Sequence, residues 1–335
     1  MMSQYQHVGS TAWRLSVAPM MDWTDRHCRF FHRQLSPHAR LYTEMVHAQA
    51  VLHGDRQRLL GFDPAEQPVA LQLGGSEPAT LAQAAKIAED FGYAEVNLNV
   101  GCPSERVQSG SFGACLMREP ALVADCFAAM QAAVRIPVTI KCRIGVDDQD
   151  PEDALFGFVA AIAAAGCRIF AVHARKAWLK GLSPKENREI PPLAYPLVYR
   201  LKRERPELMV LINGGITTID AVHAHLQHVD GVMLGRAAYH TPYLLHQLER
   251  ELFAPAAVLQ PRATLLRLLE PYVRAQRARG VALKHIVRHV LGLFHGEPGG
   301  RAFRQVLSSG AHRADADWAL VEQALAATTA RREAA

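Results

Sequence analysis

Hydrophobic positions along the chain fall into eight short segments that the pattern predicts to be buried β-strands. These segments are Leu15–Met20, Leu41–Met45, Val69–Gly74, Glu95–Gly101, Val138–Gly145, Arg168–Arg175, Met209–Ile216 and Gly231–Ala237. Between several of them lie Ala-rich amphipathic stretches of helical period, at Thr80–Phe91, Pro120–Val134, Pro151–Ala165 and Ile219–His228. Strand followed by helix, repeated about eight times, predicts an α/β fold, the (β/α)8 TIM barrel. An open doubly wound sheet is the alternative. It would need a Gly-rich fingerprint after the first strand, where the chain has Met21-Asp22-Trp23 instead.

The pattern changes after about Tyr243, where strand-like segments stop and helical period takes over. Helices are predicted over Ala263–Arg279, Val281–Phe294, Gly300–Ser308 and Asp317–Arg331, and the sequence GEPGG at 296–300 separates two of them. We therefore expect two domains, a barrel over residues 1–245 and a C-terminal helical bundle over residues 246–335.

Composition is typical of a globular protein, because 49% of the 335 residues are hydrophobic and 21% are charged. The first residues have neither a basic nor an apolar leader segment, and the apolar stretch Val159–Ala165 is too short to span a bilayer. The six cysteines form no CxxC and no framework spacing. We therefore expect a cytoplasmic, reduced protein.

Charge is distributed unevenly along the chain. The net charge is +5, but from Arg250 to the end 13 Lys and Arg stand against 7 Asp and Glu, a balance of +6. A basic C-terminal part is typical of a domain that binds a polyanion such as nucleic acid, although a solvated helical face would look the same.

In a (β/α)8 barrel the carboxyl ends of the strands carry the active site. Gly-rich turns follow the seventh and eighth strands, at Asn213-Gly214-Gly215 and Gly235-Arg236. Backbone N–H groups in such turns hold a phosphate in barrels of this kind, and an arginine adds donors. These glycines can also be explained by tight turns alone.

The polar side chains of the other strand ends narrow the choice of ligand. Lys141 and His173 are predicted to face the mouth from adjacent strands, and Gln72 and Asn99 add amide groups. A lysine buried in a barrel must meet an anion or lose its proton. FMN, a flat heterocycle with carbonyl and N–H edges and a phosphate, would satisfy all of these groups. No HExxH is present, and His285 and His289 lack a third ligand, so no metal site is expected.

Cys102 lies in a turn directly after the fourth strand, in the sequence NVGCPS. A thiol at this position is well placed for chemistry, although a free cysteine often only packs. Cys115, in the sequence FGACLM, is the rival thiol, and we expect it to pack at the start of a helix.

Several separated motifs resemble the tRNA-dihydrouridine synthases, and most of all their DusA branch, which acts on uridines 20 and 20a of the tRNA D-loop. The motifs are APMMDWTDRHCR at 18–29, LYTEMV at 41–46, ALQLGGSEP at 70–78, NLNVGCPSERVQSGSFGACLM at 97–117, HARKAWLKGLSPKENREIPPL at 173–193, INGGI at 212–216, DGVMLGRAAY at 230–239 and HVLGLFHGEPG at 289–299. They cover nearly the whole chain and agree in order.

The resemblance implies a flavin-binding barrel followed by a helical tRNA-binding domain, with Cys102 as the proton donor. It implies that FMN is held by Ala18, Pro19, Met20, Gln72, Lys141, His173, Asn213, Gly214, Gly215, Gly235 and Arg236. NADPH is the expected reductant of FMN. Hydride would then pass from FMNH⁻ to C6 of uracil, and Cys102 would deliver a proton to C5.

For tRNA we expect contacts from Asn99, Lys185, Asn187, Arg188, Arg301 and Arg304. The helical pair Arg301 and Arg304, like Lys284 and Arg288, falls on one helix face. Lys176 and Lys180 extend the set in the long loop after the sixth strand. We expect a monomer, because one tRNA must reach an open barrel mouth.

Three alternatives remain. A flavin dehydrogenase acting on free dihydropyrimidines would share the barrel and Lys141 but would not need the basic tail. An RNA chaperone would use the tail without a flavin, and a phosphosugar isomerase would need only the barrel.

Overall fold

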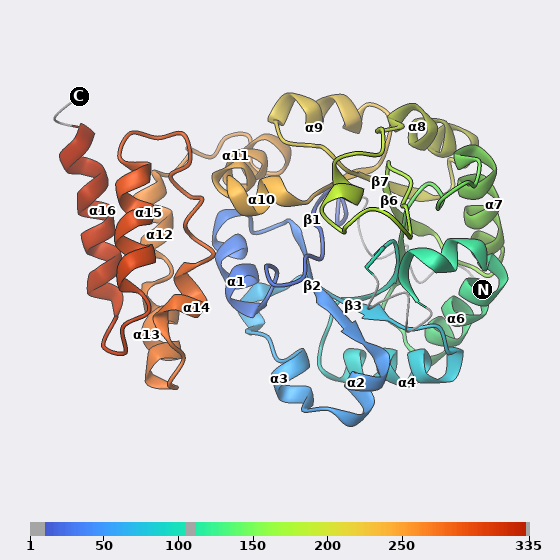
Figure 1. Cartoon of the computed structure of the whole chain (residues 1–335), viewed down its shortest axis with the longest axis horizontal. Coiled ribbons are helices and arrows are strands. Elements are labelled where there is room, and N and C mark those ends of the chain that lie inside the picture. The colour runs from blue at the N-terminus through green and yellow to red at the C-terminus, as the bar shows by residue number, and fades with distance from the viewer. Residues whose placement is uncertain (1–10, 105–111, 333–335) are drawn as a thin grey trace. The chain divides into compact units, whose positions relative to one another are not determined.

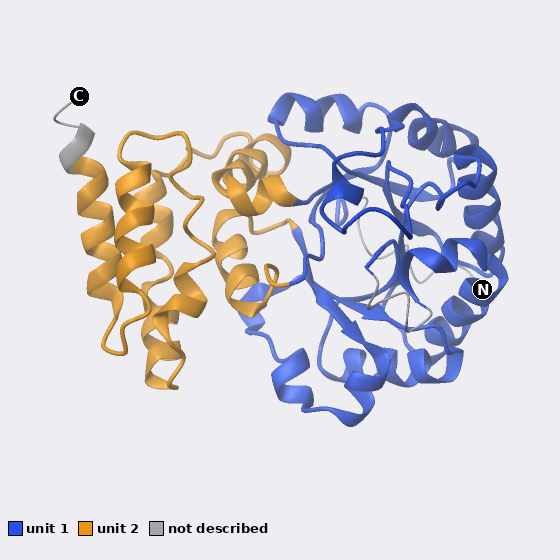
Figure 2. Ribbon diagram, in the orientation of Figure 1, with its two compact units in different colours: residues 1–21, 40–235 blue, residues 22–39, 236–335 orange. Residues whose placement is uncertain are grey.

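The computed structural model of the chain describes residues 11–104 and 112–332, with the backbone alone for residues 330–332. It forms two compact units (Figure 2). The first, the barrel unit, contains the chain up to Met21 together with Arg40–Gly235. The second, the helical unit, contains Asp22–Ala39 and the chain from Arg236 onward.

The barrel unit is built on eight parallel strands that close into a barrel in sequence order (Figure 1). The strands are β1 Leu15–Val17, β2 Arg40–His47, β3 Val69–Gly74, β4 Glu95–Val100, β5 Val138–Cys142, β6 Ile169–His173, β7 Met209–Asn213 and β8 Gly231–Leu234. The predicted (β/α)8 barrel is confirmed. An open sheet is excluded because β1 pairs with β8. Most strands end earlier than predicted, which leaves the residues beyond them free to form loops at the barrel mouth.

Helices connect the strands on the outside of this barrel (Figure 1). They are α2 Ala48–His53, α3 Arg56–Leu60, α4 Pro78–Asp90, α6 Pro120–Ala133, α7 Pro151–Ala164, α8 Tyr195–Glu204 and α9 Ile219–Leu226, with 3₁₀ turns η2 Pro64–Glu66, η3 Gly113–Arg118 and η4 Glu186–Arg188. Local sequence sets several helix starts. Asp150 accepts hydrogen bonds from the first N–H groups of α7, and Pro151 at the first helical position needs no acceptor.

The barrel interior is apolar over part of its depth. One cluster of buried side chains comes from β2, β3, β6, β7 and β8 and from the residues that flank β1: Trp13, Ala18, Tyr42, Ala70, Ile169, Ala171, Leu211 and Met233. Inward-pointing residues that alternate along each strand produce such layers. Small alanines at positions 18, 70 and 171 share this cluster with the large side chains of Trp13, Tyr42 and Met233.

The helical unit consists of α1 and the helices after the barrel. Their bounds are α1 Arg26–Leu35, α10 Arg236–His240, α11 Tyr243–Leu252, α12 Arg262–Arg267, α13 Glu270–Ala278, α14 Leu283–Val287, α15 Gly300–Gly310 and α16 Trp318–Arg332. The segment around α1 is joined to this unit by side chains. The Phe30 ring stacks on Tyr272 with centroids 3.9 Å apart. The Glu249 carboxylate accepts from the Ser36 hydroxyl at 2.6 Å.

The predicted helical character of the C-terminal part is confirmed, but two predicted helices are shorter or divided. The single helix predicted over 263–279 is two helices, α12 and α13, because Pro271 in the first turn of α13 disfavours a continuous helix through the preceding residues. The helix predicted over 281–294 is helical only over α14 and continues as turns. The functional division at 245/246 stays a prediction, and α11 runs across that position.

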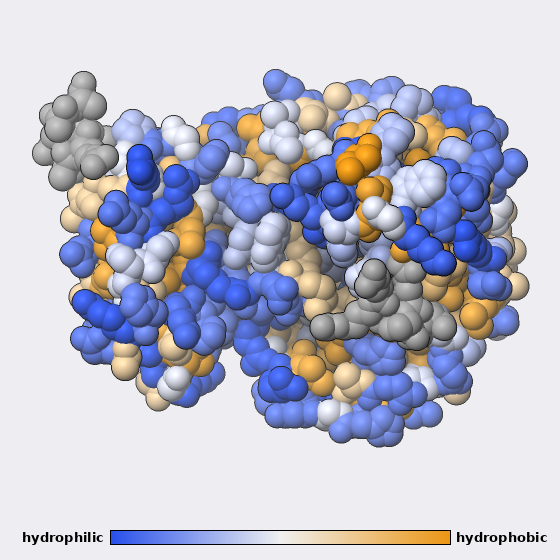
Figure 3. Space-filling model, in the orientation of Figure 1, coloured by the Kyte–Doolittle hydropathy of each residue, from blue (hydrophilic) through white to orange (hydrophobic). Residues whose placement is uncertain are grey.

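No helix in the described part of the chain has both the length and the apolar character needed to cross a bilayer. On the face drawn in Figure 3 the barrel unit is mostly hydrophilic, and its hydrophobic side chains form small separate patches.

Candidate active site

The turn after β4 brings Asn99 and Cys102 to the carboxyl end of the barrel. The Asn99 side-chain oxygen accepts hydrogen bonds from the backbone N–H groups of Gly101 and Cys102, both at 3.0 Å. This is an Asx-type turn, in which a side chain replaces the hydrogen bonds that a strand would have made. The Cys102 thiol is half-buried, and its Sγ lies 3.6 Å from the Ser104 hydroxyl oxygen. The turn therefore holds a thiol partly open at the barrel mouth. The rest of this motif, residues 105–111, lies outside the described residues.

Gln72, on the neighbouring strand β3, forms hydrogen bonds with two asparagines. Its carbonyl oxygen accepts from the Asn99 amide at 2.8 Å, and its own NH₂ donates to the Asn97 side-chain oxygen at 2.8 Å. Gln72 is buried, with 1% of its surface exposed. The predicted pair Gln72 and Asn99 is thus brought together, and these two bonds leave Gln72 one N–H and one lone pair of its oxygen.

Lys141 and Asn213 meet inside the barrel from β5 and β7. The Lys141 amine donates to the Asn213 side-chain oxygen at 3.3 Å, and the Asn213 NH₂ donates to the Met233 carbonyl at 2.7 Å. Burial lowers the pKa of Lys141 to about 8, and the nearby positive charge of Arg143 acts in the same direction. An amine in this state gains most from an anionic partner, and the anion expected at this lysine stays a prediction.

His173, at the end of β6, lies opposite Asn213 in the strand register and is buried. Burial first, and then the positive charges of Arg143 and Lys141, hold its pKa well below the ordinary value. His173 is therefore a neutral imidazole near pH 7. Such a ring can donate one hydrogen bond and accept another without adding a further charge to the site.

The turn after β7 needs both of its glycines. Gly214 and Gly215 have φ values of +115° and +71°, which favour glycine. A Cβ on Gly214 would also lie 2.6 Å from Cδ2 of the His173 ring. His173 thus packs directly on the turn that was predicted to hold a phosphate.

The remaining residues predicted to hold a cofactor lie at the ends of β1 and β8. Ala18 is buried beside β8 and donates its N–H to the Leu234 carbonyl at 2.7 Å, and Pro19 and Met20 are half-buried after it. Gly235 follows β8, and a Cβ there would meet no neighbouring atom. Arg236 begins helix α10 in the next position of the chain. The turn after β8 is therefore open enough for a ligand to approach its backbone.

Arg143 has a role that sequence reasoning missed. It follows β5, is 3% exposed, and its guanidinium donates to three backbone carbonyls: Gly101 at 3.0 Å, Lys176 at 3.0 Å and Asn187 at 2.9 Å. It thereby ties the Cys102 turn to the long loop after β6. The only sequence signal was its spacing two residues after Lys141, which gives both side chains the same direction.

The long loop after β6 is organised around Asn187. This side chain is fully buried, and its polar atoms bond the backbone of the loop itself. Lys185 and Arg188 are exposed on either side of it. The burial of Asn187 gives no support to a direct contact with tRNA, which stays a prediction. The exposure of Lys185 and Arg188 is compatible with their predicted contacts.

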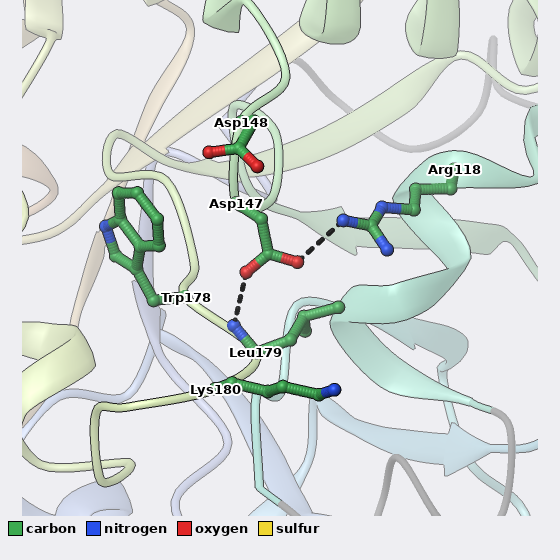
Figure 4. Close-up of a pocket in the computed structure, with 6 residues that line it drawn as sticks. All are labelled: Arg118, Asp147, Asp148, Trp178, Leu179 and Lys180. Atoms are coloured by element: carbon green, nitrogen blue, oxygen red, sulfur yellow. Dashed lines mark hydrogen bonds and ion pairs between the residues drawn. The ribbon is translucent and has the colours of Figure 1, made fainter.

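Asp147 anchors this loop to its neighbours, as Figure 4 shows. One carboxylate oxygen accepts the Leu179 N–H at 2.7 Å, and the other pairs with Arg118 at 2.7 Å. A cavity of about 550 Å³ opens beside this anchor. Its lining residues are Arg118, Asp147, Asp148, Trp178, Leu179 and Lys180. The anchor thus shapes a hollow next to the loop predicted to meet tRNA.

The other cysteines differ from Cys102 in their surroundings. Cys115 lies in η3, where its thiol donates to the Phe112 carbonyl at 3.2 Å, and burial raises its pKa. Cys142 is fully buried, next to the half-buried Lys141, and burial raises the pKa of Cys142 to about 12. Among the described residues, no group of three or more His, Cys, Asp or Glu side chains could hold a metal ion.

In the helical unit, Arg301 and Arg304 are exposed on helix α15. Lys284 and Arg288 are also exposed, but the Arg288 guanidinium donates to the Asp22 carbonyl of the same unit. Arg301 and Arg304 are therefore well presented for an external anion.

Sequence comparisons with known proteins agree on one family. The family model described as dihydrouridine synthase (Dus) matches residues 16–331. A tRNA-dihydrouridine(20/20a) synthase from Xanthomonas campestris is 67% identical over 324 residues, which is 96% of this chain and 96% of that protein. Proteins of the same name from Xylella fastidiosa (strain Temecula1) and Vibrio cholerae are 69% and 54% identical; both alignments cover 93% of this chain, and they cover 94% and 96% of those proteins.

A solved structure, the old yellow enzyme homologue from Zymomonas mobilis, is similar with a TM-score of 0.51 at 12% identity, over 73% of this chain and 89% of that one. At this identity the likeness concerns the barrel fold alone. The sequence motifs and the near-complete match of the family model together decide the assignment: this chain belongs to the dihydrouridine synthase family.

Proposed function

We propose that this protein is an FMN-dependent tRNA-dihydrouridine synthase that reduces the C5=C6 bond of uridines 20 and 20a in the tRNA D-loop. Family membership supports the reaction class. Relatives named tRNA-dihydrouridine(20/20a) synthase, at 54–69% identity, support the two positions. The observation that carries the proposal is the register pairing of Asn99 with Lys141, which puts the Cys102 turn beside a half-buried lysine at one end of the barrel.

The side chains at this end fit FMN by their chemistry. A half-buried lysine with a lowered pKa, a neutral imidazole and two side-chain amides suit the polar edge of an anionic flavin. Glycine turns after β7 and β8 suit a phosphate, and the backbone at Gly235 is open to a ligand. The residues proposed to hold FMN are Ala18, Pro19, Met20, Gln72, Lys141, His173, Asn213, Gly214, Gly215, Gly235 and Arg236.

Bound FMN would supply the hydride that adds to C6 of the uracil. Uracil is a conjugated enone, so this addition builds negative charge on O4 and C5, and a positioned acid at C5 completes the reduction. Cys102 is the proposed acid. Asn99 keeps it in place through the two backbone hydrogen bonds of the turn. A uridine in a folded tRNA must leave its stack to reach such a thiol.

Contacts with tRNA are proposed for two exposed basic sets. Lys185 and Arg188 flank the buried Asn187 in the loop after β6, and Arg301 and Arg304 lie on α15. Phosphate contacts of this kind position the substrate without reading sequence. Asn99 would meet the target nucleotide at the barrel mouth, and Asn187 would act by shaping its loop.

NADPH is the proposed reductant, and we place the reaction in the cytoplasm, carried out by a monomer. All six cysteines are free thiols, which suits a reducing compartment.

The experiment that tests this function has two parts. The purified protein should show the yellow absorption of bound flavin, and NADPH should bleach it. tRNA from a strain lacking this protein should then lose dihydrouridine at positions 20 and 20a, and regain it on addition of the purified protein with NADPH. A colourless protein, or turnover of free uracil without tRNA, would contradict the proposal.

A further inference from the structure

A buried carboxylate lies at the opposite end of strand β4 from the Cys102 turn. Glu95, the first residue of β4, is fully buried. Its Oε2 accepts from the Trp13 indole N–H at 2.7 Å and pairs with Arg40 at 3.2 Å. Its Oε1 accepts from the Tyr42 hydroxyl at 2.7 Å and from the Thr139 hydroxyl at 2.6 Å.

The chemistry of these partners determines the direction of each bond. An indole N–H and a guanidinium can only donate, so Oε2 must accept. A carboxylate oxygen accepts from both hydroxyls on the Oε1 side as well. The single proton of the Thr139 hydroxyl is therefore committed to Glu95, and Thr139 has only lone pairs left for its other neighbour.

A chain of side-chain amides continues from this hydroxyl toward the barrel mouth. The Asn97 NH₂ donates to Thr139 Oγ1 at 2.8 Å, and the Gln72 NH₂ donates to the Asn97 oxygen at 2.8 Å. The Asn99 NH₂ then donates to the Gln72 oxygen at 2.8 Å. We call Thr139, Asn97, Gln72 and Asn99 the amide ladder. Along this series of bonds each amide turns its NH₂ toward the end at Glu95, which begins β4 at the barrel floor, and its oxygen toward the end at the Cys102 turn.

The upper end of the amide ladder requires the same polarity. The backbone N–H groups of Gly101 and Cys102 can only donate hydrogen bonds, so the side-chain oxygen of Asn99 must be the acceptor. The Glu95 carboxylate at one end can only accept hydrogen bonds, and the N–H groups of Gly101 and Cys102 at the other end can only donate them. Both ends therefore require the same orientation of the three amides between them.

We propose that Glu95 is a positioning residue that sets the polarity of the amide ladder and thereby holds the turn that carries Cys102. The effect on the reaction rests on the role proposed for Cys102 above. The effect on the turn does not, because it follows from hydrogen-bond direction alone.

Replacing Glu95 by Gln would put the two ends in conflict. The side chains of Trp13 and Arg40 have no hydrogen-bond acceptor, so the new NH₂ cannot bond to them. It would face the hydroxyls of Tyr42 and Thr139 instead. The Thr139 hydroxyl would then have to direct its proton toward Asn97. The Asn97 NH₂ already donates to this hydroxyl, so two donors would face each other. Either a buried hydroxyl loses its acceptor, or the three amides turn over and Asn99 presents NH₂ to the Cys102 N–H.

The test is amide hydrogen exchange at Gly101 and Cys102 in the full-length protein as purified, read residue by residue. We expect Glu95→Gln to raise exchange at these two amides at least about tenfold, because they lose their acceptor in a local opening. Amides of helix α7 report general opening of the barrel and should keep their native rates.

Tyr42→Phe is the matched control. It removes one donor from the same carboxylate oxygen but leaves the Thr139 proton directed at Glu95, so exchange at 101 and 102 should stay native. A second pair covers the case in which Glu95→Gln does not fold. Thr139→Val cuts the amide ladder and should raise exchange at the turn, whereas Thr139→Ser keeps the hydroxyl and should not.

Native exchange at 101 and 102 in Glu95→Gln, or in Thr139→Val if only that variant folds, would overturn the proposal. An equal rise of exchange at residues 101 and 102 in Tyr42→Phe would also overturn the proposal. General loosening around Glu95 would then explain the faster exchange without any change in amide orientation. The measurement needs neither tRNA nor turnover. It therefore decides about the amide ladder even if Cys102 proves not to be the acid.

Discussion

The side chain of Asn187 holds the backbone of Trp178 from both directions. Its oxygen accepts the Trp178 N–H at 2.7 Å, and its NH₂ donates to the Trp178 carbonyl at 2.9 Å. Residues 178–187 of the loop are thus closed by one buried amide. Arg143 reinforces the closure by donating to the Asn187 carbonyl.

Asn187→Ala should therefore loosen the loop after β6 without unfolding the barrel. The loop contains Lys176, Lys180 and Lys185, so trypsin should cleave it at least about tenfold faster once its hydrogen bonds are lost. Lys185→Ala, an exposed change in the same loop, is the control and should leave cleavage at the other two lysines native. Equal cleavage of the wild type and Asn187→Ala would show that the amide does not hold the loop.

Lys141 should make FMN binding sensitive to pH. With a pKa of about 8 in the free protein, its amine is charged below that pH and loses its proton above it. An anionic ligand favours the charged amine, so FMN affinity should be constant below about pH 8. Above that pH it should fall by up to about tenfold per pH unit.

The measurement for Lys141 is titration of flavin-free protein with FMN from pH 6.5 to 9.5, followed by flavin fluorescence. Lys141→Met should bind FMN more weakly at pH 7 and show no fall in affinity near pH 8. If wild type and Lys141→Met share one pH dependence, this amine does not meet the flavin.

Arg301 and Arg304 should contribute to the salt dependence of tRNA binding. Each lost phosphate contact lowers the slope of log affinity against log salt by about one, so Arg301→Ala/Arg304→Ala should lower it by up to about two. The control is Arg267→Ala/Arg274→Ala, which removes the same charge from arginines already paired with Glu322 and Glu270. If both double variants give the same slope of log affinity against log salt, Arg301 and Arg304 do not contact tRNA phosphates.

Much of the fold could be predicted because the strands are short hydrophobic segments whose signal is local. Lys141 and His173 could also be oriented from strand alternation and from their place at strand ends. In contrast, Glu95 looked only like the start of a strand. Its partners come from residues 13, 40, 42 and 139, which the closed barrel alone brings together.

Other features depended on contacts that no local pattern contains. The segment 22–39 belongs to the helical unit through the Phe30–Tyr272 stack and the Glu249 carboxylate. Asn187 looked like a polar loop residue open to a ligand, but the backbone of its own loop surrounds it. Polarity in a loop indicates hydrogen bonding and does not say with which partner.

The central claim is that the Cys102 thiol donates the proton that completes uridine reduction. Cys102→Ala should keep its bound flavin and its reduction by NADPH, while the general-acid contribution, about 10²–10⁴-fold, is lost from the tRNA half-reaction. Cys115→Ala is the matched control and should react like the wild type.

The measurement is rapid mixing of the NADPH-reduced protein with dihydrouridine-free tRNA, following the return of the oxidised flavin spectrum. The account predicts a rate at least about 100-fold slower in Cys102→Ala than in Cys115→Ala. Equal rates in these two variants would contradict it.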